Sequence, residues 1–392
     1  MVMQTKTAGP GQFAAFDLAS VPSPCFVTDL ARLEDNLAVL KDVADQSGAQ
    51  ILTALKAFSL WSAAPLVSRY LSGACASGLY EARLARSHYV KGPEEGLVSC
   101  FAPAYKPQNM AELADICDHI IFNSPQQIAR FAAQARAGGA EIGLRINPGL
   151  PLGEVETYDP SAPRSRLGLP ISQIEDDIFN QISGLHMHSL CEQGFAELAR
   201  LVEVIRPLLE RANGRLSWLN LGGGHMITAP DYDRAGLVAC LAELKQTYQL
   251  DIYLEPGTAI AFDAGILVGE VLDVMDNDGP VAILDISATC HMPDVLEAPY
   301  RPGLLAEPDT GPLVRLGGPS CLAGDVIGDY RFDRLPVPGQ RLAFLDQAHY
   351  SMVKTTMFNG VPLPALALWD SRTDDLSLVR EFSYADFESR LS

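Results

Sequence analysis

The sequence holds four kinds of group that could do chemistry together: an amine, imidazoles, a carboxylate and a run of glycines. Lys56 stands in the apolar run ILTALKAF, where a buried ammonium is costly unless it is paired, neutralised or used in a reaction. His186 and His188 are two residues apart and, on a strand, would point the same way. Gly222–Gly224 could let the backbone approach an anion closely, and Glu255 offers a carboxylate.

Eight short apolar runs are predicted to be the strands that position these groups. Most of the runs end in Gly, Pro, Asn or Ser, and most are separated by segments with the helical spacing of apolar residues. Eight strand-then-helix units over this length are typical of a (β/α)8 barrel, assigned here to residues 28–265. In chain order the runs are ILTALKAF (51–58), GACAS (73–77), GLVSCF (96–101), HIIFNS (119–124), EIGLRINP (141–148), ISGLHMH (182–188), LSWLNLGGG (216–224) and DIYLEPG (251–257).

Three of the intervening segments show clear helical spacing of their apolar residues. Ser124 followed by Pro125 is typical of a helix start, and Gly138 and Gly214 are typical of helix ends. The three predicted helices are AELADICD (111–118), SPQQIARFAAQARAGG (124–139) and FAELARLVEVIRPLLERANG (195–214).

The chain changes character after about residue 265, where strand-like segments follow one another without a long amphipathic helix. ILVGEVLDVMD, PVAILDISAT, PLVRLGGPSC, QRLAFLDQAHYSMV and LPALALWD are separated by turns such as DNDGP and PVPGQ. PSPCFVTDL (22–30) is predicted to add a strand to them. The expected fold class is α/β: a TIM-like (β/α)8 barrel followed by an all-β domain, a β-sandwich or β-barrel of residues 1–27 and 266–392.

The active site of such a barrel forms at the carboxyl ends of its strands, so the residues at those ends are considered together. Lys56 ends the first strand, Arg145 and Asn147 the fifth, His188 the sixth and Glu255 the eighth, with the glycines after the seventh. Singly, each has a plain structural explanation. Together they indicate pyridoxal phosphate: the glycines hold the phosphate, Lys56 bonds to the aldehyde, Glu255 keeps the ring nitrogen protonated and His188 lies against the ring.

Composition limits the ligands and the surroundings of the protein. The net charge of −19 and the pI of about 4.7 argue against nucleic acid and would suit a cationic ligand. The eight cysteines form no CxxC pair, so a reducing cytoplasm is the expected location. The N-terminus lacks a signal pattern and no apolar run has the length of a membrane span, so no membrane contact is expected.

Longer motifs make the chain resemble a known group of enzymes. A barrel with its lysine on the first strand, followed by a β domain, resembles the alanine racemase-like group of pyridoxal phosphate enzymes, known as fold type III. GPSCLAGD (318–325) and HYSMVKTTMFNG (349–360) resemble the ornithine and diaminopimelate decarboxylases. ALKAF, GLHMHSLCE, LEPG, DISATCHMPDVLEAPYRP and YDPSAPRSRLG resemble the carboxynorspermidine (carboxyspermidine) decarboxylases more closely. The resemblance runs from about residue 22 to the C-terminus.

The resemblance implies a role for each matching residue. The expected catalytic residues are Lys56, Cys321, His188 and Glu255, with Cys321 acting at the α-carbon of the substrate. The expected cofactor-binding residues are Lys56, His188, Gly222, Gly223, Gly224, Glu255, Gly257, Tyr350 and Arg145, with Tyr350 contacting the phosphate. The expected substrate-binding residues are Glu255, Asp285, Asp294, Asp325 and Cys321, with the three aspartates directed at distal amines. No metal ligand is expected.

Two departures narrow the substrate that the resemblance implies. Thr258 follows EPG where the ornithine and diaminopimelate branches have arginine, and Ala74 stands where the ornithine branch has an acidic residue. The implied reaction is therefore decarboxylation of carboxynorspermidine or carboxyspermidine, polycationic substrates, to norspermidine or spermidine in polyamine biosynthesis. A head-to-tail homodimer is also implied, in which Cys321 and Asp325 reach the barrel mouth of the neighbouring chain.

Four other functions stay open at the level of the sequence. A decarboxylase of diaminopimelate or ornithine is one, and an amino-acid racemase, which needs two bases on opposite faces, is another. A metal-dependent barrel hydrolase would use His186 and His188 with Asp285 or Glu255, and would leave Lys56 without a role. A non-catalytic pyridoxal phosphate-binding protein would need neither the β domain nor GPSC.

Overall fold

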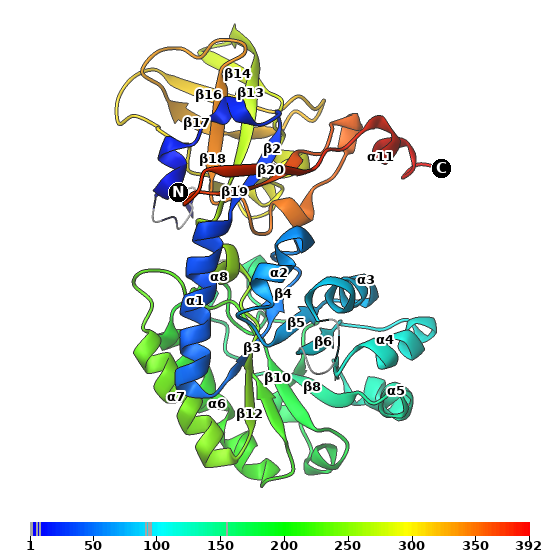
Figure 1. Ribbon diagram of the computed structural model, residues 1–392. Helices are drawn as coiled ribbons and strands as arrows, with labels where there is room; N and C mark the ends of the chain where they lie inside the picture. Colours follow the sequence, from blue (N-terminus) through cyan, green and yellow to red (C-terminus); the bar gives the residue numbers. More distant parts are fainter. Residues whose placement is uncertain (1–2, 5–6, 8, 91, 93–95, 154–155) are drawn as a thin grey trace. The chain divides into compact units, whose positions relative to one another are not determined.

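The computed structural model describes the chain apart from residues 1–2, 5–6, 8, 91, 93–95 and 154–155 (Figure 1). The chain divides into two compact units, here called the barrel unit and the sheet unit. The barrel unit is Glu34–Ile260, and the sheet unit is Met1–Leu33 together with Ala261–Ser392. Among the described residues, no helix has both the length and the apolar character needed to cross a membrane.

The barrel unit is a nearly closed parallel barrel, which confirms the predicted fold class. Its strands pair in the order β3-β12-β11-β10-β8-β7-β6-β5-β4, with β9 added at β8. Every predicted run contributes a strand, and Leu52 divides the first run into β3 and β4. The bounds are β3 (Gln50–Ile51), β4 (Thr53–Ala54), β5 (Gly73–Ala76), β6 (Leu97–Phe101), β7 (His119–Phe122), β8 (Glu141–Asn147), β9 (Leu169–Pro170), β10 (Gly184–Met187), β11 (Trp218–Asn220) and β12 (Asp251–Leu254).

Helices lie outside these strands (Figure 1). They are α1 (Leu30–Ser47), α2 (Ala64–Val67), α3 (Leu79–Leu84), α4 (Met110–Ile116), α5 (Pro125–Ala137), α6 (Phe195–Ala212), α7 (Arg234–Tyr248) and α8 (Thr258–Ala261). As predicted, the Ser124 side chain caps α5, Pro125 begins it and Gly138 is its C-cap. Helix α6 is capped by Asn213 rather than Gly214, because asparagine tolerates the left-handed φ of 49° found there.

One end of the barrel is filled by Trp218. A Cβ atom on Gly143 or Gly184 would lie only 2.4 or 2.0 Å from the Trp218 ring, so these two strands must carry glycine at this level. The ring of His119 stacks on the indole with a centroid distance of 4.4 Å. The indole N–H donates to Glu141 over 2.8 Å. Since β11 begins at Trp218, this plug lies at the amino ends of the strands, opposite the predicted site.

The sheet unit is built on a mixed sheet with the strand order β17-β16-β14-β13-β2-β19-β20, and β18 pairs with β13. Strand β2, predicted from PSPCFVTDL, lies between β13 and β19. The bounds are β2 (Cys25–Asp29), β13 (Gly265–Asp276), β14 (Pro280–Leu284), β16 (Leu313–Gly317), β17 (Val326–Arg331), β18 (Arg341–Leu345), β19 (Ala365–Asp370) and β20 (Asp375–Arg380). Strands β1 (Met3–Gln4) and β15 (Tyr300–Arg301) form a separate pair, and short helices are α9 (Ala288–His291), α10 (Asp294–Glu297) and α11 (Tyr384–Glu388).

Alternate residues of the central strands enter two different cores, as the period of two in a β-strand requires. Phe26 and Leu267 belong to the core that also holds Phe344. Their neighbours Val27 and Ile266 belong to a second core, which includes Phe13, Phe16 and Trp369. The sheet is therefore buried on both faces at its centre, and this explains the nearly continuous apolar runs of β2 and β13.

Candidate active site

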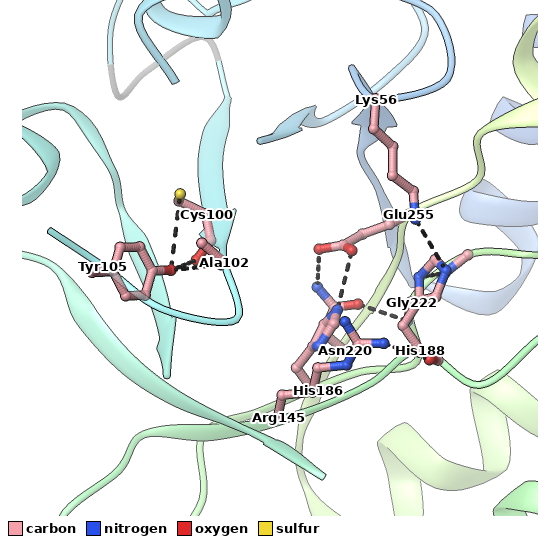
Figure 2. Close-up of polar contacts among 11 residues, drawn as sticks. Lys56, Cys100, Ala102, Tyr105, Arg145, His186, His188, Asn220, Gly222 and Glu255 are labelled. Carbon is pink, nitrogen blue, oxygen red and sulfur yellow. Dashed lines mark hydrogen bonds and ion pairs between the residues drawn. The ribbon is translucent and has the colours of Figure 1, made fainter. Parts of the chain in front are cut away.

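Lys56 follows the carboxyl end of β4, in the turn that leaves the barrel wall. Its Nζ atom lies 3.2 Å from Nε2 of His188 (Figure 2). Burial lowers the pKa of Lys56, and the nearby Arg145 guanidinium lowers it further, whereas Glu255 raises it. The net lowering favours the neutral amine, which is the nucleophilic form of a lysine.

His188 directly follows β10, and its protonation state also favours a neutral Lys56. Its Nδ1 accepts the Gly223 N–H over 2.9 Å. Burial lowers the pKa of His188 well below its usual range, and a positive charge on Lys56 or Arg145 lowers it further, so the ring is neutral. A neutral imidazole that accepts at Nδ1 carries its proton on Nε2, and this N–H donates to the lone pair of the Lys56 amine.

Glu255, directly after β12, is buried with a donor at each carboxylate oxygen. His186 Nε2 lies 3.2 Å from Oε2, and the side-chain amide of Asn220 donates to Oε1 over 2.7 Å. Burial would raise the pKa of Glu255, but His186 and the hydrogen bond from Asn220 outweigh it and the net pKa is lowered. Burial lowers the pKa of His186, so we assign a neutral His186 that donates to an ionised Glu255.

Asn220 is a site residue that the sequence prediction missed. Its side-chain oxygen accepts the Gly222 N–H over 2.8 Å while its amide donates to Glu255. The backbone N–H of Glu255 in turn donates to the Gly222 carbonyl over 2.7 Å. Arg145, His186 and Asn220 occupy paired positions on β8, β10 and β11. Asn220 could have been identified from the sequence, because it is a polar residue at the strand position that corresponds to Arg145 and His186.

The triple glycine is required by close packing as well as by turn geometry. Gly222 and Gly224 have φ values of 69° and 86°, in the left-handed region that favours glycine. A Cβ on Gly223 would lie 2.0 Å from the Glu255 carbonyl oxygen, and one on Gly224 would lie 2.1 Å from that of Leu190. The N–H groups of Gly222 and Gly223 are donated within the chain, which leaves Gly224 of the three for an outside acceptor.

Arg145 lies beside this cluster without joining the glycine turn. Its guanidinium donates to the His188 carbonyl over 2.8 Å and stacks over the Phe101 ring at 4.4 Å. Burial lowers its pKa to about 10, although Glu255 opposes the shift. Figure 2 shows the side chains of Lys56, Glu255 and Arg145 lying close to those of His186 and His188, which both come from β10 and the residue after it. Gly257, the remaining predicted barrel residue, directly precedes α8.

The other predicted site residues belong to the sheet unit, and each aspartate there has partners in its own unit. Asp285 accepts the Glu270 N–H over 2.8 Å. Asp294 and Glu297 both bind the ammonium of Lys354. Tyr350 has a φ of 51°, an uncommon conformation for an aromatic residue. Cys321 is exposed in the loop after β16.

Comparisons with known proteins place the chain in a family. Residues 25–348 match the family model described as pyridoxal-dependent decarboxylase, C-terminal sheet domain. The chain belongs to the pyridoxal-dependent decarboxylases. Family membership makes this chain a pyridoxal-dependent carboxy-lyase, which argues against the metal-dependent hydrolase. His186, His188 and Glu255 do offer ligand atoms within 4.8 Å of one another, so the same side chains satisfy the distance requirement of a metal site.

Two relatives and one solved structure are similar to this decarboxylase over nearly its whole length. The carboxynorspermidine/carboxyspermidine decarboxylase of Campylobacter jejuni is 36% identical over 94% of this chain and 98% of its own length. The carboxyaminopropylagmatine decarboxylase of Synechocystis sp. is 39% identical over 95% of this chain and 96% of its own. The crystal structure of carboxynorspermidine decarboxylase complexed with norspermidine from C. jejuni superposes with a TM-score of 0.85 at 34% identity, covering 94% of this chain and 100% of that one.

The barrel side chains of the decarboxylase fit the cofactor that its family uses. A neutral amine suits attachment to an aldehyde, and an ionised, buried carboxylate suits a protonated ring nitrogen. A neutral imidazole beside the amine suits contact with an aromatic ring. The turn at Gly224 suits an anion, because a glycine there leaves the backbone N–H without a side chain in the way. Gly257 directly precedes α8.

Proposed function

We propose that this protein removes carbon dioxide from carboxynorspermidine or carboxyspermidine, giving norspermidine or spermidine in polyamine biosynthesis. The observation that carries the proposal is the set of half-buried Lys56 and His188 with buried Glu255, in a chain 36% identical to a decarboxylase of these compounds over nearly its full length. The net charge of −19 is complementary to a substrate with several ammonium groups.

The barrel residues divide the work of the reaction. When bound, pyridoxal phosphate supplies an electron sink for the bond to the departing carboxylate. Lys56 attaches the cofactor, and its lowered pKa keeps the amine reactive. Glu255 holds the proton on the ring nitrogen, while His186 and Asn220 hold Glu255 ionised. Gly224, Gly257, Tyr350 and Arg145 are assigned to cofactor binding.

The sheet unit is assigned the return of a proton to the substrate and the binding of its distal ammonium groups. Cys321 carries an exposed thiol and is proposed to return a proton to the substrate α-carbon after carbon dioxide leaves. Asp285 and Asp294 are proposed to pair with distal ammonium groups, in exchange for the partners they now have. Each such hydrogen bond, once desolvated, would contribute about 1.5–3 kcal/mol, or about one to two orders of magnitude in selectivity.

Carboxyaminopropylagmatine is a second candidate substrate, because the Synechocystis relative that acts on it by name is 39% identical to this chain. Its guanidinium end donates in a plane and suits a bidentate carboxylate acceptor, whereas a primary ammonium group can donate to a carboxylate from many directions. Carbon dioxide release from carboxynorspermidine, carboxyspermidine, carboxyaminopropylagmatine, diaminopimelate and ornithine therefore tests the proposal. We expect one of the first two to have the highest kcat/KM. Faster turnover of diaminopimelate or ornithine would refute the polyamine assignment, and a preference for carboxyaminopropylagmatine would support the second candidate.

A homodimer with shared active sites is proposed as the working form. The exposed Cys321 thiol and the barrel cluster lie in different units, and a barrel mouth alone leaves the reaction open to water. Lys56→Ala and Cys321→Ala homodimers should each be nearly inactive. Random re-association should return about a quarter of wild-type activity, since half of the dimers carry one intact site of two. A mixture that stays inactive while heterodimers form would place Cys321 in the site of its own chain.

A further inference from the structure

The loop GPSCLAGD (318–325) joins β16 to β17 and carries the exposed Cys321 at its middle. Asp325, at its end, is only 3% exposed. The loop is closed on itself, because the Gly318 N–H donates to the Asp325 carbonyl over 2.8 Å and the Asp325 N–H donates to that of Leu322 over 2.9 Å. A compact loop with a buried carboxylate at its base therefore presents the thiol.

The Asp325 carboxylate receives hydrogen bonds from two separate segments. From its own loop, the Ser320 hydroxyl donates over 2.6 Å and the Ser320 N–H over 3.3 Å. From the start of α9, the Ser287 hydroxyl lies 2.8 and 3.0 Å from the two oxygens and the Thr289 N–H donates over 3.2 Å. A buried carboxylate needs this number of donors, and together they occupy its acceptor positions.

The shape of the loop depends on this carboxylate. A Cβ atom on Gly318 would lie 2.4 Å from an Asp325 carboxylate oxygen, so the glycine leaves the space that the carboxylate fills. The tip of the loop has a second attachment, since the Cys321 N–H donates to the side-chain oxygen of Asn359 over 2.8 Å. Asn359 itself has a left-handed φ of 57° in the FNG turn. The backbone of Cys321 is thus held directly by Asn359, and through its neighbour Ser320 by Asp325.

We propose that Asp325 and Asn359 are positioning residues that fix the thiol of Cys321, and that Asp325 does not bind an amine of the substrate. This inference rests on the proposed role of Cys321 as the proton donor. Its physical reason is the number of donors already on Asp325, which leaves no acceptor position for an ammonium. A reacting group displaced by about 1 Å loses on the order of 100-fold in rate, so the anchors act on turnover rather than on binding.

The test compares Asp325→Asn and Asn359→Ala with the matched control Asp329→Asn. Asp329 lies on β17 next to the loop and pairs with Arg315 on the surface. Two measurements are made: kcat and KM on the holoenzyme, and the rate of Cys321 alkylation by iodoacetamide without substrate, followed by peptide mapping. Cys321 is the exposed cysteine among those described, so its labelling stands apart from the rest.

Both anchor variants should lower kcat by about 10- to 100-fold, change KM by less than about 2-fold, and alter the alkylation rate of Cys321. Asp329→Asn should change none of these quantities. Asn359 is exposed, so Asn359→Ala tests the anchor even if Asp325→Asn unfolds the sheet unit. A raised KM with unchanged kcat in Asp325→Asn would show that Asp325 binds substrate, and an unchanged alkylation rate in both variants would show that neither residue positions the thiol. If Cys321→Ala kept full activity, the role of the thiol would fail, while the alkylation result would still decide whether the loop is anchored.

Discussion

The barrel cluster and the Cys321 loop bring functional groups into place by opposite means. In the barrel, Glu255 is buried and Lys56 and His188 are half-buried, and loss of solvent together with neighbouring charges shifts the pKa of each. In the loop, the thiol is exposed and what lies buried is Asp325, the residue that holds the loop. The barrel therefore sets the protonation states of its groups, whereas the loop sets the position of the thiol. Substitutions in the barrel should change pH dependence and cofactor attachment, and substitutions in the loop should change kcat and thiol reactivity.

The largest expected difference separates Lys56→Ala from Cys321→Ala. Lys56→Ala should remove the covalent link to the cofactor and lower turnover by at least ~1,000-fold, because no other group supplies the attached amine. Cys321→Ala should also lower turnover but keep the visible absorbance of the lysine-bound cofactor. Borohydride reduction and peptide mapping identify the attachment site, with Lys41→Ala as the control lysine, because the Lys41 side chain lies at the surface and pairs with Asp45. A cofactor-linked peptide at any other lysine would overturn the assignment.

Glu255→Gln is expected to keep the cofactor attached while lowering kcat by about 100- to 1,000-fold. Glutamine cannot hold a positive ring nitrogen as a carboxylate does, and loss of one preorganised electrostatic contact has an effect of that order. The measurement is kcat for carbon dioxide release, with bound cofactor counted by absorbance. Glu141→Gln, at the opposite end of the barrel, is the control. An unchanged kcat would mean that Glu255 contacts some other group.

Asn220→Ala should have a smaller effect, a loss of about 10- to 100-fold in kcat/KM. The substitution removes one hydrogen bond to the ionised Glu255, and such a bond contributes about 1.5–3 kcal/mol. It also frees the Gly222 N–H, so the affinity for pyridoxal phosphate should fall. Asn109→Ala is the control, because the Asn109 side chain makes no capping bond at the start of α4. Equal activities of the two variants would remove Asn220 from the site.

The smallest effect concerns the pH at which cofactor attaches to cofactor-free protein. Attachment requires the neutral amine, so its rate should rise as the pH rises through the pKa of Lys56 and level off below the range of an ordinary lysine. Arg145→Met removes a charge that lowers this pKa and should move the midpoint up, whereas Glu255→Gln should move it down. Stopped-flow absorbance across pH measures the midpoint, with exposed Arg83→Met as the control. Shifts of the opposite sign would contradict the electrostatic account.

How well the sequence predicted each part depends on how local the cause is. The strand ends could be predicted, because apolar runs and their terminal Gly, Pro or Asn residues are local signals. Strands β17 and β20 were not predicted, since β20 is almost wholly exposed and β17 mixes polar with apolar residues. Asn220 was missed because its importance comes from Glu255, a neighbour in space and not in sequence.

The aspartates of the sheet unit also show that contacts between residues distant in sequence could not be predicted. Their residue type suits an ammonium partner, so the prediction for Asp285, Asp294 and Asp325 followed chemistry alone. The structure adds their existing partners: a backbone N–H for Asp285, Lys354 for Asp294 and several donors for Asp325. Apart from Ser320, which lies in the same loop as Asp325, these partners are far from their aspartates in sequence. The residue type of each aspartate therefore could not show which partner it has.

The central place of β2 in the sheet has a consequence for the order in which a ribosome can finish this molecule. Strand β2 is synthesised before the whole barrel unit, yet its two neighbours, β13 (Gly265–Asp276) and β19 (Ala365–Asp370), are both synthesised after it. The intervening residues 34–260 can meanwhile close their own barrel, because domains fold as units while synthesis continues. The growing chain must therefore carry the apolar segment CFVTD without its strand partners until the barrel unit has been synthesised, which exposes this segment to other contacts during that time.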